Sequence, residues 1–173
     1  SVIQLAKSVS AVVIATAGSE QNREYCRQLG ADLVLDYRSA EIDDALQQFS
    51  EPHGGINVWF ETQRQPTLDR SVTYMARRGR IVLMAGRDAR PEFPVGPFYV
   101  KDLRMMGFAM FNASPDEQRT AADAINRLAA DGQWNPKIGA MLPLSEVAAA
   151  HQLQEDNTLG QQGTLAGKIV LEV

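Results

Sequence analysis

Short apolar segments alternate with amphipathic segments along most of the chain. The apolar runs lie at 11–16, 33–36, 57–61 and 81–85. Runs of this length without a polar side predict strands that are buried on both faces. Between them, the segment 42–49 repeats its apolar residues with the 3.6-residue period of one helix face, and segments 2–9 and 66–76 are also predicted helices. The alternation predicts a parallel sheet with helices on both faces.

Helix-start signals mark several boundaries. Ser19 and Ser145 are expected N-caps, and Pro66 suits a first helical turn. Ser114 and Glu117 form the pattern of a capping box, which predicts a helix that runs to Gly132. The remaining expectations are a loop at 86–97, strands at 103–111, 138–142 and 168–173, and a helix at 145–155.

The predicted order begins with a helix, whereas a doubly wound α/β sheet begins with a strand. We therefore expect such a sheet without its first strand. In this fold the chemistry lies outside the carboxyl ends of the strands. The segments at these strand ends, where site residues are expected, are 17–19, 36–38, 61–63 and 85–87.

Composition limits the kinds of partner. The net charge of −4 argues against nucleic acid or an anionic membrane surface as the main partner. No apolar run approaches the length of about 20 residues that spans a bilayer. Cys26 is the one cysteine, which favours the reducing cytoplasm, and only His53 and His151 are histidines, so no zinc site is expected in this chain.

Several strings resemble one family in order and spacing. They are IQLAK at 3–7, VIATAGS at 13–19, LGAD at 29–32, GRIVLMAG at 79–86, PLSEVAAAH at 143–151 and GKIVL at 167–171. Together they resemble medium-chain dehydrogenase/reductases, in the branch of quinone oxidoreductase-like and zinc-type alcohol dehydrogenase-like proteins.

The resemblance implies a Rossmann-like NADP(H)-binding domain over 1–136 and a segment over 137–173 that returns to a catalytic domain. The glycine-rich pyrophosphate turn would precede Ser1. The implied activity is hydride transfer between a nicotinamide cofactor and a carbonyl, quinone, enone or alcohol, in a homodimer. No residue of this chain is expected to be catalytic, the chain alone is expected to be inactive, and zinc use by the full-length protein stays open. The alternative is a relative that binds nucleotide as a sensor or structural protein without catalysis.

The choice between NADP and NAD depends on the end of the apolar run 11–16, which would be the second strand of the complete fold. An NAD-specific site usually has a carboxylate there, and this chain has Ser19 instead. In similar NADPH-dependent enzymes a serine, a lysine and a tyrosine hold the 2′-phosphate. Ser19 and Tyr37 match, the lysine position is Asn22, and Arg23 or Arg38 would replace the lysine. NADP is therefore expected in preference to NAD, although Ser19 could be a helix cap only and Arg23 a surface charge.

The rest of the cofactor is expected along the other strand ends. The candidate contacts are Thr62, Ala85, Gly86, Phe111 and Asn112, of which Phe111 could instead be a core aromatic. The segment 61–64 either lines the adenosine side or begins a helix. Arg87 and Arg90 lie in the loop after the apolar run 81–85 and are candidates to contact a cofactor phosphate or a substrate carboxylate.

Overall fold

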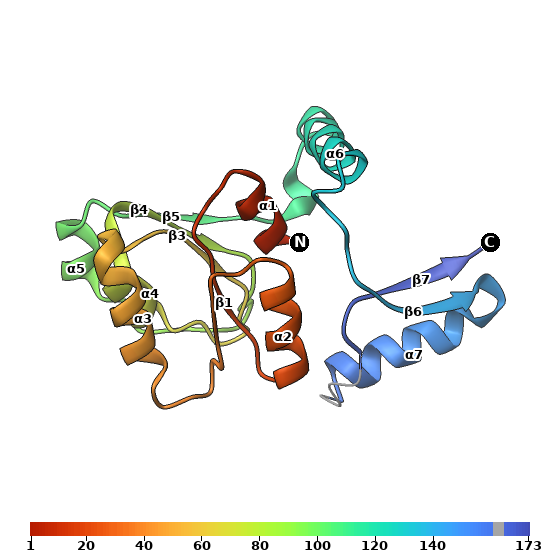
Figure 1. Ribbon diagram of the computed structural model, residues 1–173, viewed down its shortest axis with the longest axis horizontal. Helices are drawn as coiled ribbons and strands as arrows, with labels where there is room; N and C mark the ends of the chain where they lie inside the picture. The colour runs from red at the N-terminus through yellow and green to blue at the C-terminus, as the bar shows by residue number, and fades with distance from the viewer. Residues whose placement is uncertain (161–164) are drawn as a thin grey trace. The chain divides into compact units, whose positions relative to one another are not determined.

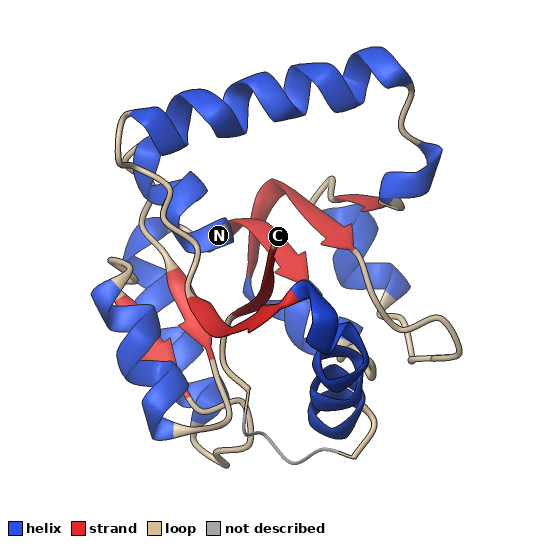
Figure 2. Ribbon diagram, turned by 90° about the vertical axis from the view of Figure 1, so that its right-hand side faces the viewer, coloured by secondary structure: helices blue, strands red, loops and turns tan. Residues whose placement is uncertain are grey.

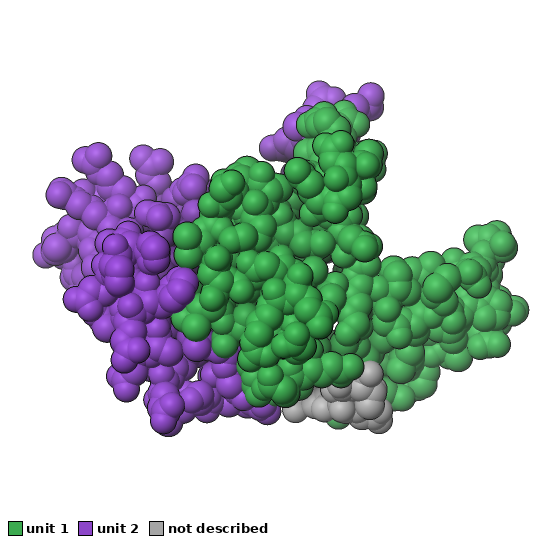
Figure 3. Space-filling model, viewed as in Figure 1, with its two compact units in different colours: residues 1–34, 121–173 green, residues 35–120 purple. Residues whose placement is uncertain are grey.

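The computed structural model describes residues 1–160 and 165–173, and it is an α/β protein (Figures 1 and 2). It divides into two compact units, which Figure 3 shows in different colours. Unit 1 contains 1–34 and 121–173, and unit 2 contains 35–120.

Unit 1 begins with the alternation that the sequence predicts. Its first elements are α1 (Val2–Ser8), β1 (Ile14–Thr16), α2 (Glu20–Gln28) and β2 (Leu33–Leu35), whose last residue is the first of unit 2. β1 and β2 form a two-stranded sheet. After α2, Gly30 takes φ +93°, the left-handed conformation expected of the residue that follows a helix.

The C-terminal part of unit 1 is a β–α–β arrangement. Its elements are β6 (Ile138–Pro143), the 3-10 turn η3 (Leu144–Glu146), α7 (Val147–Thr158) and β7 (Lys168–Glu172). β6 and β7 are parallel, and α7 lies along them (Figure 1). Ser145 lies inside η3 rather than at the N-cap of α7, so its predicted capping role is wrong. The 3-10 turn satisfies the first backbone groups that a cap would have served.

Unit 2 contains the main parallel sheet. Its elements are α3 (Ile42–Ser50), η1 (Glu51–His53), β3 (Ile56–Glu61), α4 (Leu68–Tyr74), β4 (Met75–Leu83), α5 (Val95–Val100), β5 (Arg104–Gly107), η2 (Met110–Asn112) and the start of α6 (Pro115–Ala130). The strand order is β3-β4-β5, with β4 parallel to both neighbours. The expected parallel α/β class is confirmed, with the strands distributed over three sheets rather than one.

The core of unit 2 lies between this sheet and α4. Trp59, Ile81 and Met105 are partners across the three strands and pack on one face with Val72 of α4. Ile81 and Val72 are fully buried, so this helix–sheet contact is the best-shielded part of the unit. Removal of such apolar surface from water is the main stabilising contribution.

Several boundaries differ from the sequence predictions. α4 begins at Leu68 after the N-cap Thr67, so Pro66 precedes the helix and its predicted place in the first turn is wrong. Met75 and Ala76 are buried as expected, but they lie in β4 and not in the helix. Two adjacent apolar residues can be buried either in the last turn of a helix or at the start of a strand, so their spacing did not distinguish the two. The loop expected at 86–97 gives way to α5, whose Phe98 packs on the core. The strand expected at 103–111 ends at Gly107, and η2 follows it.

Candidate functional site

The carboxyl ends of the three strands of unit 2 meet at one edge of the sheet. Glu61, Leu83 and Gly107 are register partners, and each is the last residue of its strand. Beyond them, Met84 N–H donates to the Glu61 carbonyl at 3.1 Å, and Phe108 N–H donates to the Leu83 carbonyl at 3.1 Å. The loops after β3, β4 and β5 therefore leave the sheet side by side.

This edge brings together the predicted site residues of unit 2 that directly follow a strand. Thr62 comes immediately after β3, and Ala85 and Gly86 come just after β4. Phe111 and Asn112 lie in η2, after β5. In a parallel sheet this is the edge at which ligands bind.

Gly86 has little space for a side chain. Its φ is +88°, and a β-carbon added to it would lie 3.2 Å from Pro66 Cδ and 3.3 Å from the Arg64 carbonyl oxygen. The loop after β4 therefore lies directly against the loop after β3. Glycine permits both the positive φ and this close approach of two backbones.

Phe111 is 89% exposed, so the alternative that it is a core aromatic is wrong. Its neighbours Met110 and Phe108 are also exposed. A large aromatic ring in this position is available for stacking or packing against a ligand or another protein surface.

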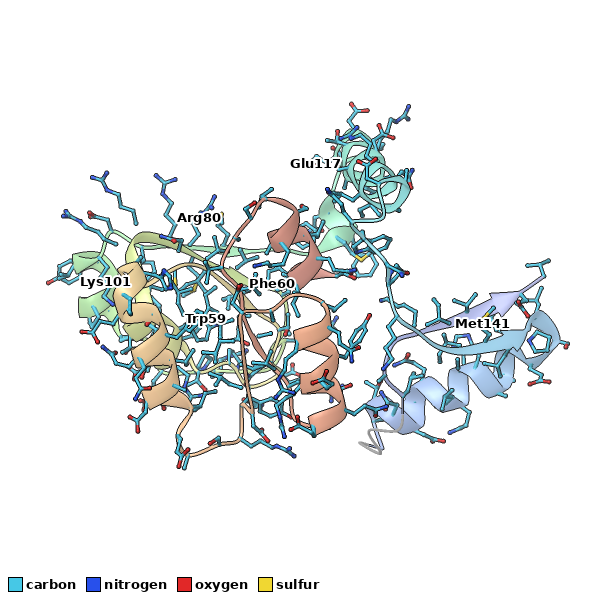
Figure 4. The ribbon with its side chains drawn as sticks, viewed as in Figure 1. Trp59, Phe60, Arg80, Lys101, Glu117 and Met141 are labelled. Atoms are coloured by element: carbon cyan, nitrogen blue, oxygen red, sulfur yellow. The ribbon has the colours of Figure 1, made fainter. Side chains whose placement is uncertain are left out.

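A buried carboxylate underlies the edge. Glu61 is only 4% exposed, and its two oxygens accept hydrogen bonds from Trp59 Nε1 at 3.1 Å and from Gln63 N at 2.8 Å. Sequence reasoning placed Glu61 in a loop that either lines the ligand or begins a helix, and missed this role. The available signal was a glutamate at the end of an apolar strand, two residues after a tryptophan. Figure 4 labels Trp59 on β3.

The predicted 2′-phosphate residues of unit 1 lie at the start of α2. Ser19 caps the helix, and its Oγ accepts from the backbone N–H of Asn22 at 3.2 Å. The Arg23 guanidinium binds Glu20 Oε2 at 2.7 Å and approaches the Ala17 carbonyl at 3.4 Å. This is the start of a helix, where unpaired N–H groups and the helix dipole favour anions.

Glu20 is held by two arginines of its own helix. Arg27 Nη1 lies 2.9 Å from Glu20 Oε1, in addition to the Arg23 contact. The hydrogen bond from Arg27 and then that from Arg23 lower the pKa of Glu20, so its carboxylate stays charged and paired. The Arg23 side chain is 19% exposed and is paired with Glu20, so it differs from the solvated surface charge of the alternative interpretation.

Tyr37 and Arg38 lie in unit 2. Tyr37 is 44% exposed, and the Arg38 guanidinium carbon is 5.7 Å from the centre of its ring. Arg38 also pairs with Asp36, with Nε and Oδ1 3.2 Å apart. Because Ser19 and Tyr37 belong to different units, their expected closeness stays a prediction.

Among residues 1–160 and 165–173, no group of three or more His, Cys, Asp or Glu side chains is arranged to hold a metal ion. Within the same residues, no helix has both the length and the apolar character that crossing a membrane requires.

Comparison with known proteins decides the family. The family model described as zinc-binding dehydrogenase matches residues 1–128. The chain belongs to this family of medium-chain dehydrogenase/reductases. Human quinone oxidoreductase is 24% identical over 168 residues, which cover 97% of this chain and 49% of that protein. The chain thus spans about half the length of the curated relatives that it matches.

Solved structures of other proteins share the fold. An NAD-dependent alcohol dehydrogenase superposes with a TM-score of 0.77 at 27% identity, over 99% of this chain and 46% of that one. A mycobacterial protein solved with NADPH gives a TM-score of 0.77 at 19% identity, over 99% of this chain and 52% of that one. The second likeness, at its lower identity, concerns the fold alone.

Proposed function

We propose that this chain is the NADP(H)-binding domain of an oxidoreductase, which transfers hydride between nicotinamide and a carbonyl, quinone, enone or alcohol. The observation that carries the proposal is the shared carboxyl edge of β3, β4 and β5 in a chain of this family. Thr62, Ala85 and Gly86 follow these strands where a doubly wound sheet binds its ligand. The reaction class is supported by the names of two similar proteins, a quinone oxidoreductase and an NAD-dependent alcohol dehydrogenase.

The proposed preference for NADP rests on the start of α2. The segment from Thr16 to Ser19 carries no carboxylate that would repel a 2′-phosphate. The nearest acid, Glu20, is paired with Arg23 and Arg27. Ser19 keeps its hydroxyl hydrogen for donation to a phosphate, since its oxygen accepts the bond from Asn22 N–H. We propose that Tyr37 completes this phosphate site.

In this proposal the bound cofactor supplies the hydride chemistry, and the chain supplies binding and orientation. Ala85 and Gly86 offer backbone and little side chain, so the nicotinamide ribose can approach the sheet edge closely. Exposed Phe111 would cover the ring and exclude water, with Asn112 beside it. None of these residues is assigned a proton-transfer step.

Fluorescence titration of the full-length protein with NADPH and NADH tests the cofactor preference. We expect NADPH to bind at least about tenfold more tightly, a difference of about 1.4 kcal/mol. Ser19→Asp should remove the preference, because it adds a negative charge where the 2′-phosphate would lie. Ser19→Asn is the matched control, since asparagine caps a helix as well as aspartate but carries no charge. Equal affinities for the two cofactors in the parent protein would contradict the preference.

Turnover assays separate an enzyme from a non-catalytic nucleotide-binding relative. The full-length protein is mixed with NADPH and a panel of quinones, enones and aldehydes, and the loss of NADPH absorbance is followed. We expect oxidation of NADPH with at least one class. The reverse reaction is tested with NADP and a panel of alcohols. Tight NADPH binding with no turnover in either direction would favour the sensor or structural alternative.

A homodimer in the cytoplasm is part of the same proposal. β5 is an edge strand of its sheet, and apolar Met106 and Phe108 on and after it are 44% and 51% exposed. An exposed apolar edge of this kind favours pairing with a second copy. Light scattering of the full-length protein should give twice the monomer mass, and Met106→Lys should halve it.

A further inference from the structure

The Glu61 carboxylate connects the end of β3 to the loop that follows it. Glu61 lies on the same face of the sheet as Trp59, and both of its partners are N–H groups, one from the Trp59 indole and one from the Gln63 backbone. An acceptor-only carboxylate satisfies both donors at once. Its burial would be costly without them.

A cation on α4 lies within electrostatic range of this carboxylate. The charge of Glu61 contributes to the raised pKa of Arg70, after the larger effects of the Asp43 hydrogen bond, burial and the Asp43 and Tyr74 charges. The carboxylate thus has two hydrogen-bond donors and a neighbouring positive charge. The geometry alone shows what the group holds, since one carboxylate oxygen accepts from the Trp59 indole and the other from the Gln63 backbone.

The loop that Glu61 holds is the one that lies against Gly86. From Gln63 the chain continues through Arg64 to Pro66. The Arg64 carbonyl oxygen and the Pro66 Cδ atom occupy the space next to Gly86. The loop after β3 cannot shift toward β4 without meeting the Gly86 backbone. The Gln63 N–H bond holds it from the opposite end, at the tip of β3.

We propose that Glu61 is a positioning residue for the cofactor site, acting through the loop 62–66. Its carboxylate fixes Thr62 and the loop backbone against Gly86, so that the edge keeps one shape before the cofactor arrives. Preorganisation of this kind raises affinity because binding no longer has to order the loop. The inference rests on the proposed function, since it assigns Glu61 a role at the same edge.

Glu61→Gln tests the proposal with almost no change in volume. Glutamine replaces one of the two acceptor oxygens with an NH₂ group, so it cannot keep the present arrangement in which each oxygen accepts one bond. In the full-length protein, we expect the Kd and KM for NADPH to rise about fivefold, which corresponds to about 1 kcal/mol. The kcat at saturating NADPH should stay within about twofold, because the loop is ordered once the cofactor is bound.

Two further variants separate positioning from mere stability. Trp59→Phe removes the indole donor but leaves the Gln63 bond, so its Kd for NADPH should stay close to the parent value. Gln63→Pro removes the backbone N–H that donates to Glu61, and residue 63 is exposed. It should weaken NADPH binding as Glu61→Gln does. It remains informative if Glu61→Gln fails to fold.

Hydrogen exchange gives a readout that needs no ligand. In the free Glu61→Gln protein, a peptide over 62–66 should exchange faster than in the parent, whereas a peptide over 80–83 in β4 should not change. A parent-like Kd in both Glu61→Gln and Gln63→Pro overturns the inference. Equal weakening by Trp59→Phe and Glu61→Gln, with equal loss of stability, overturns it too. Failure of the parent protein to bind either nicotinamide cofactor instead contradicts the proposed function.

Discussion

Arg70 binds Asp43 through two parallel contacts that join α4 to α3. Arg70 Nε lies 2.8 Å from Asp43 Oδ1, and Nη2 lies 3.0 Å from Oδ2. The planar guanidinium matches the carboxylate, which makes this the most specific type of ion pair. The Arg70 hydrogen bond is the main cause of the lowered pKa of Asp43.

Asp43→Asn is expected to give a stability loss that depends on pH. The folded pKa of Asp43 lies below its unfolded value of about 3.9. The ion pair therefore contributes fully to the free energy of unfolding above the unfolded pKa, and this contribution is lost as pH falls through the folded pKa. The Asp43 side chain is 48% exposed, so screening limits the loss at pH 7 to about 0.5–1 kcal/mol. Urea unfolding from pH 7 to pH 2.5 measures it. Asp44→Asn, at the exposed next residue, is the control, and a loss that persists at pH 2.5 would contradict the assignment.

Lys101→Met is expected to destabilise the end of α4. Lys101 Nζ donates to the carbonyls of Val72, Thr73 and Met75 at 3.1, 2.7 and 3.1 Å, and Figure 4 labels this residue. Charged hydrogen bonds of this kind contribute about 1.5–3 kcal/mol when buried, so a loss of about 1–2 kcal/mol is expected at this half-buried position. Lys101→Arg keeps the charge and should lose less. Equal unfolding midpoints for Lys101→Met and the parent would show that water replaces the ammonium without cost.

Helix capping distinguishes two serines that the sequence treats alike. Ser114 N–H and Oγ both donate to Glu117 Oε2 at 2.8 Å, and Ser114 Oγ accepts from Glu117 N–H at 3.3 Å, which is the predicted capping box of α6. Ser114→Ala should therefore lower the free energy of unfolding by about 1 kcal/mol. Ser145→Ala should change it by less than about 0.5 kcal/mol, since Ser145 lies inside a 3-10 turn. Equal losses would mean that the two helix starts do not differ in this way.

Gly86→Ala should damage both stability and cofactor binding. The positive φ and the contacts with Arg64 and Pro66 predict a cost of about 1–3 kcal/mol for a non-glycine residue. Gly96→Ala is the control, because beyond its chain neighbours nothing lies near the missing β-carbon of Gly96, and it should cost less than Gly86→Ala. Thermal unfolding and NADPH titration check both variants. A neutral Gly86→Ala would show that the two loops can separate.

Local patterns predicted most of the fold. The segment 42–49 forms α3 with Ile42 and Leu46 buried. Its apolar residues are three or four positions apart, a spacing that places them on one face only in a helix. The helix α5 was not predicted, since Gly96 and Pro97 lower its intrinsic propensity and only tertiary packing of Phe98 supports it. Context of this kind is absent from a single sequence.

The site was predicted less completely than the fold. The rule that ligands bind at strand ends correctly selected Thr62, Ala85 and Gly86 as neighbours of one edge. It could not show that Glu61 turns inward, because that orientation depends on an indole N–H two residues earlier and on a loop amide two residues later. Nor could it show that Arg23 is already bound to Glu20, since arginine side chains have many rotamers.

The irregular start of β4 determines where this domain can tolerate insertions and deletions during evolution. Between the pairs Ile56–Met75 and Val58–Arg80, β4 advances five residues while β3 advances two, and Arg78 takes φ 63°. A bulge absorbs extra length by bending away from its partner strand. Related proteins should therefore vary in length before Arg80. From Arg80 to Gly86 their length should be constant, because one added residue would turn every side chain there to the other face.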